Sequence, residues 1–263
     1  RLSPIRELIE TRVYYFLGEK MKNKRTKDKE IIVHDNIRTA ILVDGGFYKK
    51  RAHTCFGEVD PDKRAEELDK YCKRHLTETI NGVTHEHQLY RIFYYDCPPI
   101  SKAIYNPIDK KNIEFSKSNT YQWTIDFFEE LKKKRKFALR LGELADADQG
   151  YYIPPQLTKD LLAKKKTIDE LKIDDLRLMM HQKGVDMKIG VDIASLAYKK
   201  AVDQIVLISG DSDFVPAAKL ARREGIDFVL DSLGAKIKPD LFEHIDGLNV
   251  RDSNFKSTFA KTK

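Results

Sequence analysis

The sequence has no apolar run near the ~20 residues that a membrane-spanning helix requires. It is also poor in cysteine, because Cys55, Cys72 and Cys97 are odd in number and show no metal-ligand spacing. We find no internal repeat. The first 20 residues are interrupted by a proline and by charged side chains, so they predict no signal peptide. We therefore expect no membrane attachment and free thiols in a reducing cytoplasm.

The composition is that of a globular protein with a basic balance. The 263 residues are 41% hydrophobic and 34% charged, enough for one large α/β domain or one domain with an appendage. The net charge is +7, and the positive charge is concentrated in residues 20–29 (KMKNKRTKDK), 132–136 (KKKRK) and 164–166 (KKK). Such tracts can neutralise phosphates, although each tract alone is better explained as a solvated helix face or a linker.

Hydrophobic patterning predicts strands alternating with helices. Short apolar runs of strand character lie at residues 39–43, 89–95, 137–141, 205–208, 226–230 and 248–250. Helical patterns cover residues 4–18, 62–79, 115–135, 187–200, 215–223 and 235–244, with a helical turn or two at 176–181. This alternation predicts a three-layer α/β fold with a mostly parallel central sheet.

The prediction divides the chain into three segments. Residues 1–38 form an N-terminal helical extension and a basic connector, residues 39–252 form the main domain, and residues 253–263 form a tail. We expect Ile41, Val43, Ile92, Val206 and Ile208 in the interior of the sheet, because parallel strands are buried on both faces.

Aspartates follow two of the predicted strands. Asp44 comes directly after residues 39–43, and Asp211 and Asp213 follow residues 205–208. If these strands are neighbours, the three carboxylates meet at the edge where α/β sheets bind ligands. Like charges so close together are unfavourable without a cation or a raised pKa. Hard oxygen ligands of this kind suit Mg²⁺ or Mn²⁺.

Each aspartate also has a purely structural interpretation. Asp213 could cap the helix that follows it, which is worth about 1 kcal/mol, and Asp186 could do the same for residues 187–200. Asp192 lies four residues after Lys188, so the two could form an ion pair on one helix face. Asp44 could serve only as a turn former beside Gly45.

Four motifs in order resemble the bacterial NYN domain family, relatives of the PIN-domain ribonucleases. They are AILVDGGFY at residues 40–48, LYRIFYYDCP at 89–98, KGVDMKIGVD at 183–192 and VLISGDSDFVP at 206–216. The resemblance covers residues 39 to about 232. It implies a PIN-like three-layer sheet, an acidic metal site and cleavage of RNA, usually single-stranded. One departure is that Gly46 and Phe47 stand where the family often has an asparagine, which could alter rate or substrate choice.

Carried over residue by residue, the resemblance implies a catalytic set of five aspartates: Asp44, Asp186, Asp192, Asp211 and Asp213. Four of them, all but Asp186, would hold one or two Mg²⁺ or Mn²⁺ ions, and Asp186 would join them or orient its helix. The hydroxyls of Ser209 and Ser212 fall where they could contact phosphate or metal-bound water. Two rim lysines and, on charge density alone, the basic tract are further candidates for substrate contacts: Lys188, Lys199, Lys132, Lys133, Lys134, Arg135 and Lys136.

The function predicted from these motifs is a metal-dependent ribonuclease, most simply an endoribonuclease. Aromatic pairs at residues 47–48 and 94–95 could stack bases, although strand aromatics more often belong to the core. One alternative is a non-catalytic RNA-binding or scaffold module with the same fold. A weaker one is a nucleotide-binding regulator. The oligomeric state stays open, and a homo-oligomer is compatible with the sequence.

Overall fold

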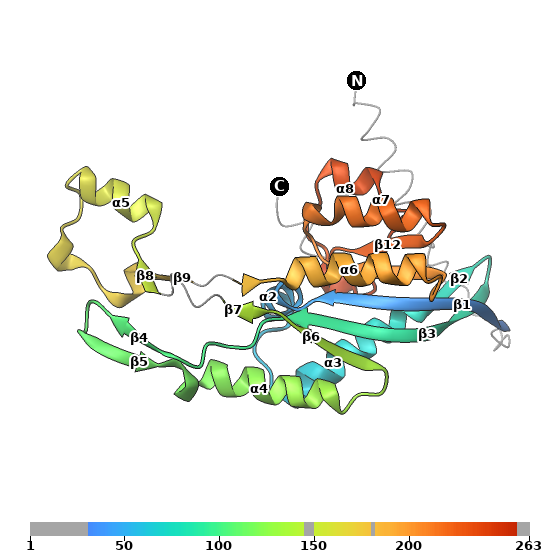
Figure 1. The fold of residues 1–263 in the computed structure, drawn as a ribbon, viewed down its shortest axis with the longest axis horizontal. Helices are drawn as coiled ribbons and strands as arrows, with labels where there is room; N and C mark the ends of the chain where they lie inside the picture. Colours follow the sequence, from blue (N-terminus) through green and yellow to red (C-terminus); the bar gives the residue numbers. More distant parts are fainter. Residues whose placement is uncertain (1–30, 145–149, 180–181, 257–263) are drawn as a thin grey trace, which may run out of the picture.

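A seven-stranded, mostly parallel sheet forms the centre of the molecule (Figure 1). The computed structural model describes residues 31–144, 150–179 and 182–256. Six strands are parallel to their neighbours, in the order β13 (Gly247–Leu248), β12 (Asp227–Asp231), β11 (Gln204–Ile208), β1 (Ile31–Asp44), β3 (Val83–Asp96) and β6 (Phe137–Leu141). Only β2 (Thr77–Ile80) is antiparallel, on the first half of β3. The predicted α/β class with a mostly parallel sheet is confirmed.

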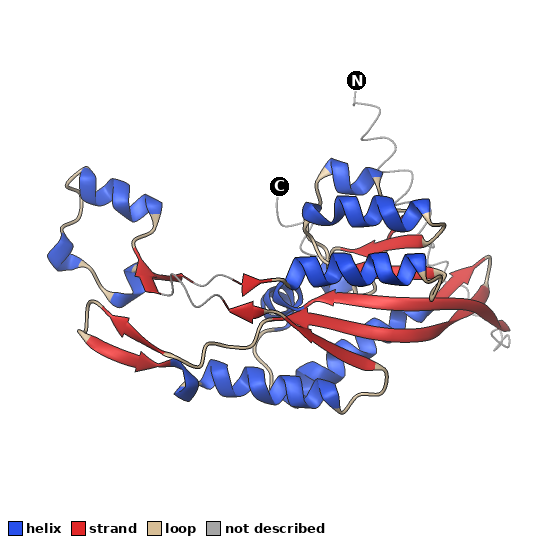
Figure 2. Ribbon diagram, viewed as in Figure 1, coloured by secondary structure: helices blue, strands red, loops and turns tan. Residues whose placement is uncertain are grey.

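Helices cover both faces of the sheet, as Figure 2 shows. One face carries α2 (Gly45–Phe56), α3 (Pro61–Lys73), α4 (Asn119–Lys132) and the short α9 (Ser253–Lys256). The other carries α6 (Val185–Tyr198), α7 (Val215–Arg223) and α8 (Pro239–Glu243). Alternate residues of β1 enter the two cores: Ile41 and Val43 pack on the first face, Ala40 and Leu42 on the second. The described part of the chain has no helix with the length and hydrophobicity needed to cross a bilayer.

The predicted sheet interior is confirmed. Ile41, Val43, Ile92, Val206 and Ile208 are all at most 1% exposed. The strands β1 and β11 pair in parallel with Val43 opposite Ile208, so the residues that follow them emerge at the same edge.

Several element boundaries differ from the prediction. β1 begins at Ile31, inside the segment assigned to the connector, because its first residues gain hydrogen bonds to β3 rather than burial. The predicted helix at 62–79 ends at Lys73, and residues 77–80 form the largely exposed edge strand β2. The predicted final helix starts only at Pro239, since the residue before a proline avoids helical geometry. Phe255, assigned to the tail, is 1% exposed in the core.

An arm extends from the carboxyl edge of the sheet (Figure 1). It contains the hairpin β4 (Ala103–Asn106) and β5 (Lys111–Glu114), the helix α5 (Pro155–Leu162) and the pair β8 (Gly150–Tyr152) and β9 (Arg177–Met179). A short antiparallel pair, β7 (Glu143–Leu144) and β10 (Gln182–Lys183), joins the arm to the domain. The predicted helical turn at 176–181 is wrong for residues 177–179, which form β9. Residues 180–181, like the predicted N-terminal helix at 4–18 and the basic tract at 20–29, lie outside the described residues.

Candidate acidic site at the carboxyl edge of the sheet

Three adjacent strands lead to an aspartate at the same edge of the sheet. Asp44 ends β1, Asp96 ends β3, and Asp211 follows the end of β11. β1 lies between the other two strands, and both pairings are parallel. The strand ends therefore meet at the carboxyl edge, where open α/β sheets bind their ligands.

Asp44 has a separate hydrogen-bond donor for each carboxylate oxygen. Its Oδ1 accepts from the backbone N–H of Phe47 at 3.0 Å, which caps α2, and its Oδ2 accepts from the buried Ser209 hydroxyl at 3.1 Å. Burial raises the pKa of Asp44, and the charges of Asp186 and Asp96 raise it further, while the two hydrogen bonds lower it. Asp44 is thus both a helix cap and a member of an interacting set of acids.

Glycines bring the start of α2 and the loop after β11 close to their neighbours. A Cβ on Gly45 would lie 2.6 Å from the Tyr95 carbonyl oxygen, and one on Gly210 would lie 2.7 Å from the Phe47 ring. Any side chain at these positions would displace backbone or a packed ring. The glycines of the two acidic motifs therefore allow Asp44 and Asp211 to approach the same place.

Asp186, Asp211 and Asp213 form the exposed side of the site. Asp211 accepts a hydrogen bond from the Asp213 N–H at 3.0 Å, and its own N–H donates to Ser209 Oγ at 3.3 Å. Asp186 lies in the first turn of α6 and is exposed, yet its pKa is raised by partial burial and then by the charges of Asp211 and Asp213. The structure therefore links four of the five predicted acids electrostatically: Asp44, Asp186, Asp211 and Asp213.

The capping alternatives are resolved differently for the individual aspartates. The N-cap of α7 is Phe214, so Asp213 does not cap that helix with its side chain. Asp211 instead caps the 3-10 turn at Ser212–Phe214, which precedes α7. The N-cap of α6 is Gly184, and Asp186, as a first-turn acid, only interacts favourably with the helix dipole.

Asp96 is a site residue that the sequence analysis did not assign. It is 1% exposed; its Oδ2 accepts from Lys49 Nζ at 2.7 Å and from the Tyr94 hydroxyl at 3.1 Å, and its Oδ1 accepts from the Cys97 N–H at 2.8 Å. Its charge contributes to the raised pKa of Asp44. The strand-then-aspartate pattern that identified Asp44 also applies to residues 89–96 and could have identified it.

Asp192 has a different environment from the other predicted acids. Its Oδ2 accepts from the Tyr95 hydroxyl at 2.8 Å and pairs with Arg140 Nε at 3.1 Å. The alternative pairing with Lys188 is wrong, because Lys188 Nζ donates to the Leu141 carbonyl at 2.8 Å. Through this hydrogen bond the Lys188 side chain reaches the carboxyl end of β6, beside the site, as expected for a rim lysine.

The other predicted lysine contacts lie at the opposite edge. Lys199 follows the last residue of α6, roughly 20 Å along the helix from Asp186 at 1.5 Å per residue. The tract 132–136 precedes β6 and therefore lies at the amino edge of the sheet. Its lysines are also engaged within the protein: Lys132 with Glu129, Lys133 with Glu130, Lys134 with Glu66, and Lys136 with the Leu89 carbonyl. The prediction that this tract leads RNA to the acids does not fit its position.

The two predicted serines differ in exposure. Ser209 is fully buried and holds Asp44, so it positions a carboxylate rather than meeting solvent. Ser212 accepts a hydrogen bond from Lys238 Nζ at 2.8 Å on the surface. Lys238 thereby places a positive charge beside the acidic loop, where the sequence analysis had assigned none.

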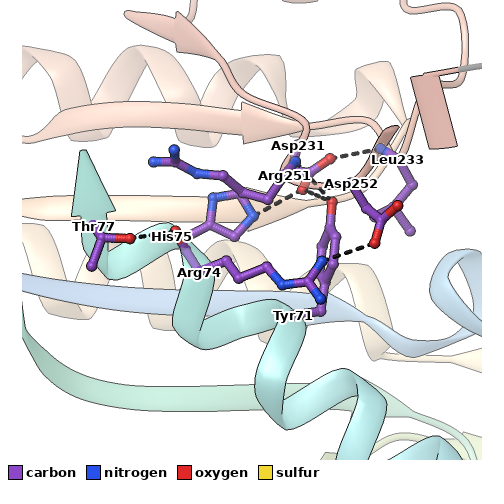
Figure 3. Close-up of polar contacts among 8 residues, drawn as sticks. All are labelled: Tyr71, Arg74, His75, Thr77, Asp231, Leu233, Arg251 and Asp252. Atoms are coloured by element: carbon purple, nitrogen blue, oxygen red, sulfur yellow. Dashed lines mark hydrogen bonds and ion pairs between the residues drawn. The ribbon is translucent and has the colours of Figure 1, made fainter. Parts of the chain in front are cut away.

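Asp231 shows what a structural aspartate looks like at the same edge (Figure 3). It ends β12 and is fully buried. Its Oδ1 accepts from the Leu233 N–H at 2.8 Å, and its Oδ2 accepts from the Tyr71 hydroxyl and from His75 Nε2, the latter at 2.9 Å. With its oxygens filled by protein donors, Asp231 joins β12 to α3 and leaves little capacity for a ligand.

The carboxylate oxygens at this edge are the kind of ligand that a divalent cation prefers. We call this group of residues the acidic edge: Asp44, Asp96, Asp186, Asp211 and Asp213. Burial first, and the charges of neighbouring aspartates after it, raise the pKa values of Asp44 and Asp186, and a cation would relieve the repulsion between these charges. Within the described residues, however, no three His, Cys, Asp or Glu side chains are grouped closely enough to hold a metal as they stand. Asp186, Asp211 and Asp213 are exposed, so their side chains have room to converge when a cation binds.

Comparisons with known proteins identify the family. The family model described as the NYN domain matches residues 108–241, about half of the chain. A crystal structure of a protein of unknown function, VPA0982 from Vibrio parahaemolyticus, is similar at 15% identity and a TM-score of 0.42, covering 88% of this chain and 99% of that one. Comparison with curated proteins gave no significant match. The matched region contains Asp186, Asp211 and Asp213 of the acidic edge, and the chain belongs to the NYN domain family.

Proposed function

We propose that this chain is a divalent-metal-dependent ribonuclease that hydrolyses phosphodiester bonds in single-stranded RNA at the acidic edge. NYN domains are generally nucleases, which supports a nuclease-related function at a coarse level. The observation that carries the finer proposal is that the Ser209 hydroxyl contacts both Asp44 and Asp211 at the carboxyl edge, where the charges of Asp211 and Asp213 also act on Asp186. A set of anions facing a polyanionic substrate is unfavourable unless a cation lies between them.

The four linked acids are the residues that would hold Mg²⁺ or Mn²⁺. When bound, the cation would supply charge stabilisation at the phosphate and make water easier to deprotonate. Ser209 fixes Asp44 through its hydroxyl, and the Asp213 N–H fixes Asp211. Tyr95 and Arg140 both hold Oδ2 of Asp192, and Arg140 already balances its charge, so we assign Asp192 a positioning role.

The cations beside the acids are suited to hold the RNA backbone. Lys188 of α6 donates to the Leu141 carbonyl at the end of β6, and Lys238 donates to the Ser212 hydroxyl. Each can neutralise a phosphate while the acids hold the metal. Because the tract 132–136 lies at the amino edge, we propose no role for it in guiding RNA to the site.

A cleavage assay on a mixed single-stranded RNA pool tests the proposal. We expect products with Mg²⁺ or Mn²⁺ and none with excess chelator. Asp211→Asn should lower the rate by on the order of a hundredfold or more, as loss of an electrostatic stabiliser does. Asp169→Asn, at an exposed position in the arm, is the matched control and should cleave like the parent. Binding of RNA without cleavage in any metal would instead support the non-catalytic RNA-binding module.

A further inference from the structure

A cavity lies on the α2, α3 and α4 face, and one of its wall residues contacts the acidic edge. Its volume is ≈ 490 Å³, within the ~300–1,000 Å³ of typical small-molecule sites. That residue is Lys49, which lines the cavity and contacts Asp96 at 2.7 Å. Lys49 is five residues after Asp44, or roughly 7 Å along the helix at 1.5 Å per residue. A group bound beside Lys49 in the cavity is therefore next to the acidic edge.

The cavity wall offers a partly exposed aromatic ring, and Phe47 beside the acids is also partly exposed. Tyr48, Tyr94 and Tyr95, next to the acids, are at most 1% exposed and belong to the core. Trp123 lines the cavity, with its ring stacked on Phe127 at a centroid distance of 5.1 Å and its Nε1 donating to the Val59 carbonyl at 2.9 Å. A ring held in this way is a pre-ordered surface for stacking a base.

The rest of the wall suits the polar parts of a nucleotide. Asn119 and Thr120 are exposed in the first turn of α4, a 14-residue helix whose N-terminal dipole favours a phosphate. The exposed His53 adds a ring nitrogen, and Glu58 adds an acceptor for the amino group of a base. Lys49 supplies a positive charge on the side of the cavity that faces the acidic edge.

We propose that this cavity binds one nucleotide of the RNA strand, with its base against Trp123 and its phosphate between Lys49 and the start of α4. The inference rests on the proposed function for the identity of the strand. It deepens that function, because a nucleotide held here fixes which phosphate of the strand reaches the acids.

Trp123 is the only tryptophan in the sequence, so intrinsic tryptophan fluorescence reports on the cavity directly. The titration is done in excess chelator, so that no cleavage occurs, with AMP, with adenosine, with inorganic phosphate and with a short single-stranded RNA. We expect saturable fluorescence changes with the RNA and AMP, a weaker one with adenosine, and none with inorganic phosphate. A response to inorganic phosphate equal to that of AMP would reduce the cavity to a simple anion site and overturn the proposal.

Variants of the wall residues test the individual contacts. His53→Ala and Asn119→Ala should each weaken AMP binding about threefold to tenfold, as loss of one polar contact does. Lys49→Ala should weaken AMP more than adenosine, whereas the neighbouring exposed Lys50, replaced by Ala, should bind like the parent. With labelled RNA and anisotropy, Trp123→Ala should weaken binding about 5- to 150-fold, and Trp123→Phe, which keeps a ring, should weaken it less.

The outcomes separate this inference from the proposed function. Metal-dependent cleavage by the parent with unchanged tryptophan fluorescence on RNA binding would refute the nucleotide site and leave the nuclease intact. Saturable fluorescence changes with AMP in a protein that never cleaves RNA would refute the nuclease and leave the nucleotide site standing. Parent-like AMP affinity in both His53→Ala and Asn119→Ala would also refute the site.

Discussion

Replacing Lys49 with methionine tests the electrostatic arrangement beside the acids. The change removes the charge but keeps a long, flexible side chain. It leaves Asp96, which is 1% exposed, with the Tyr94 hydroxyl and the Cys97 N–H as its remaining donors. Breaking a buried charge pair from one side costs about 3–5 kcal/mol. Because the Lys49 side chain is 28% exposed and two donors remain, we expect about 2–3 kcal/mol, or a Tm lower by about 5–10 °C.

Thermal unfolding in metal-free buffer measures this effect. Lys50→Met, at the next and exposed position of α2, is the matched control and should change stability by less than about 0.5 kcal/mol. The double variant Lys49→Met with Asp96→Asn should recover about 1–3 kcal/mol, since no unpaired buried charge is left. The reasoning is refuted if Lys49→Met and Lys50→Met unfold at the same temperature, or if the double variant is no more stable than Lys49→Met alone.

Three further predictions follow from local environments. The pKa of Asp44 is raised above its usual 3.8 in the folded state, so ionisation of Asp44 destabilises the metal-free protein as pH rises. We therefore expect the Tm of Asp44→Asn minus that of the parent to increase between about pH 4 and pH 7. A difference in Tm that stays constant over this range would contradict the raised pKa. Burial raises the pKa of the Cys97 thiol, so iodoacetamide at pH 7.5 should label the partly exposed Cys55 first, as peptide mass mapping would show; equal labelling would contradict this burial. Replacing Lys132 and Lys133 together with alanine should leave RNA affinity within about twofold. The two lysines form surface pairs with glutamates that contribute little to stability, and the tract is far from the acids. A large loss of affinity in an anisotropy titration would show that the tract is a binding surface.

The parts of the fold that the sequence predicted are those dominated by burial. The apolar run at 205–208 forms most of β11 and lies in the middle of the sheet, and α7 begins and ends where the pattern placed it. The missed elements are stabilised by pairing rather than by burial. β2 and β9 are short antiparallel strands with partly exposed side chains, so their sequences carry no strong period. The arm depends on such pairings, and no hydrophobic pattern predicted it.

The candidate site was predictable where it depends on strand ends. Asp44 and Asp211 each follow a buried strand, and in a parallel sheet the residues that follow the strands lie at the same edge. The sequence therefore predicted that these two acids lie at one edge. Asp192 could not be placed in this way, because its partners Tyr95 and Arg140 come from β3 and β6 and are distant in sequence. The proposed role of the tract 132–136 in guiding RNA rested on charge density alone. Composition does not show at which edge of the sheet a tract lies, because that depends on the topology.

The most direct test of the central claim is the thermal shift that Mn²⁺ produces in the parent and in Asp211→Asn. If the acids hold one cation site, the parent should gain about 2.7 kcal/mol at a Mn²⁺ concentration 100-fold above Kd, or roughly 5–10 °C in Tm. Asp211→Asn should match or slightly exceed the parent without metal, because repulsion is relieved, and should fall below it with metal. Equal Mn²⁺ shifts in both proteins, or no shift in the parent, would contradict a cation site at the acidic edge.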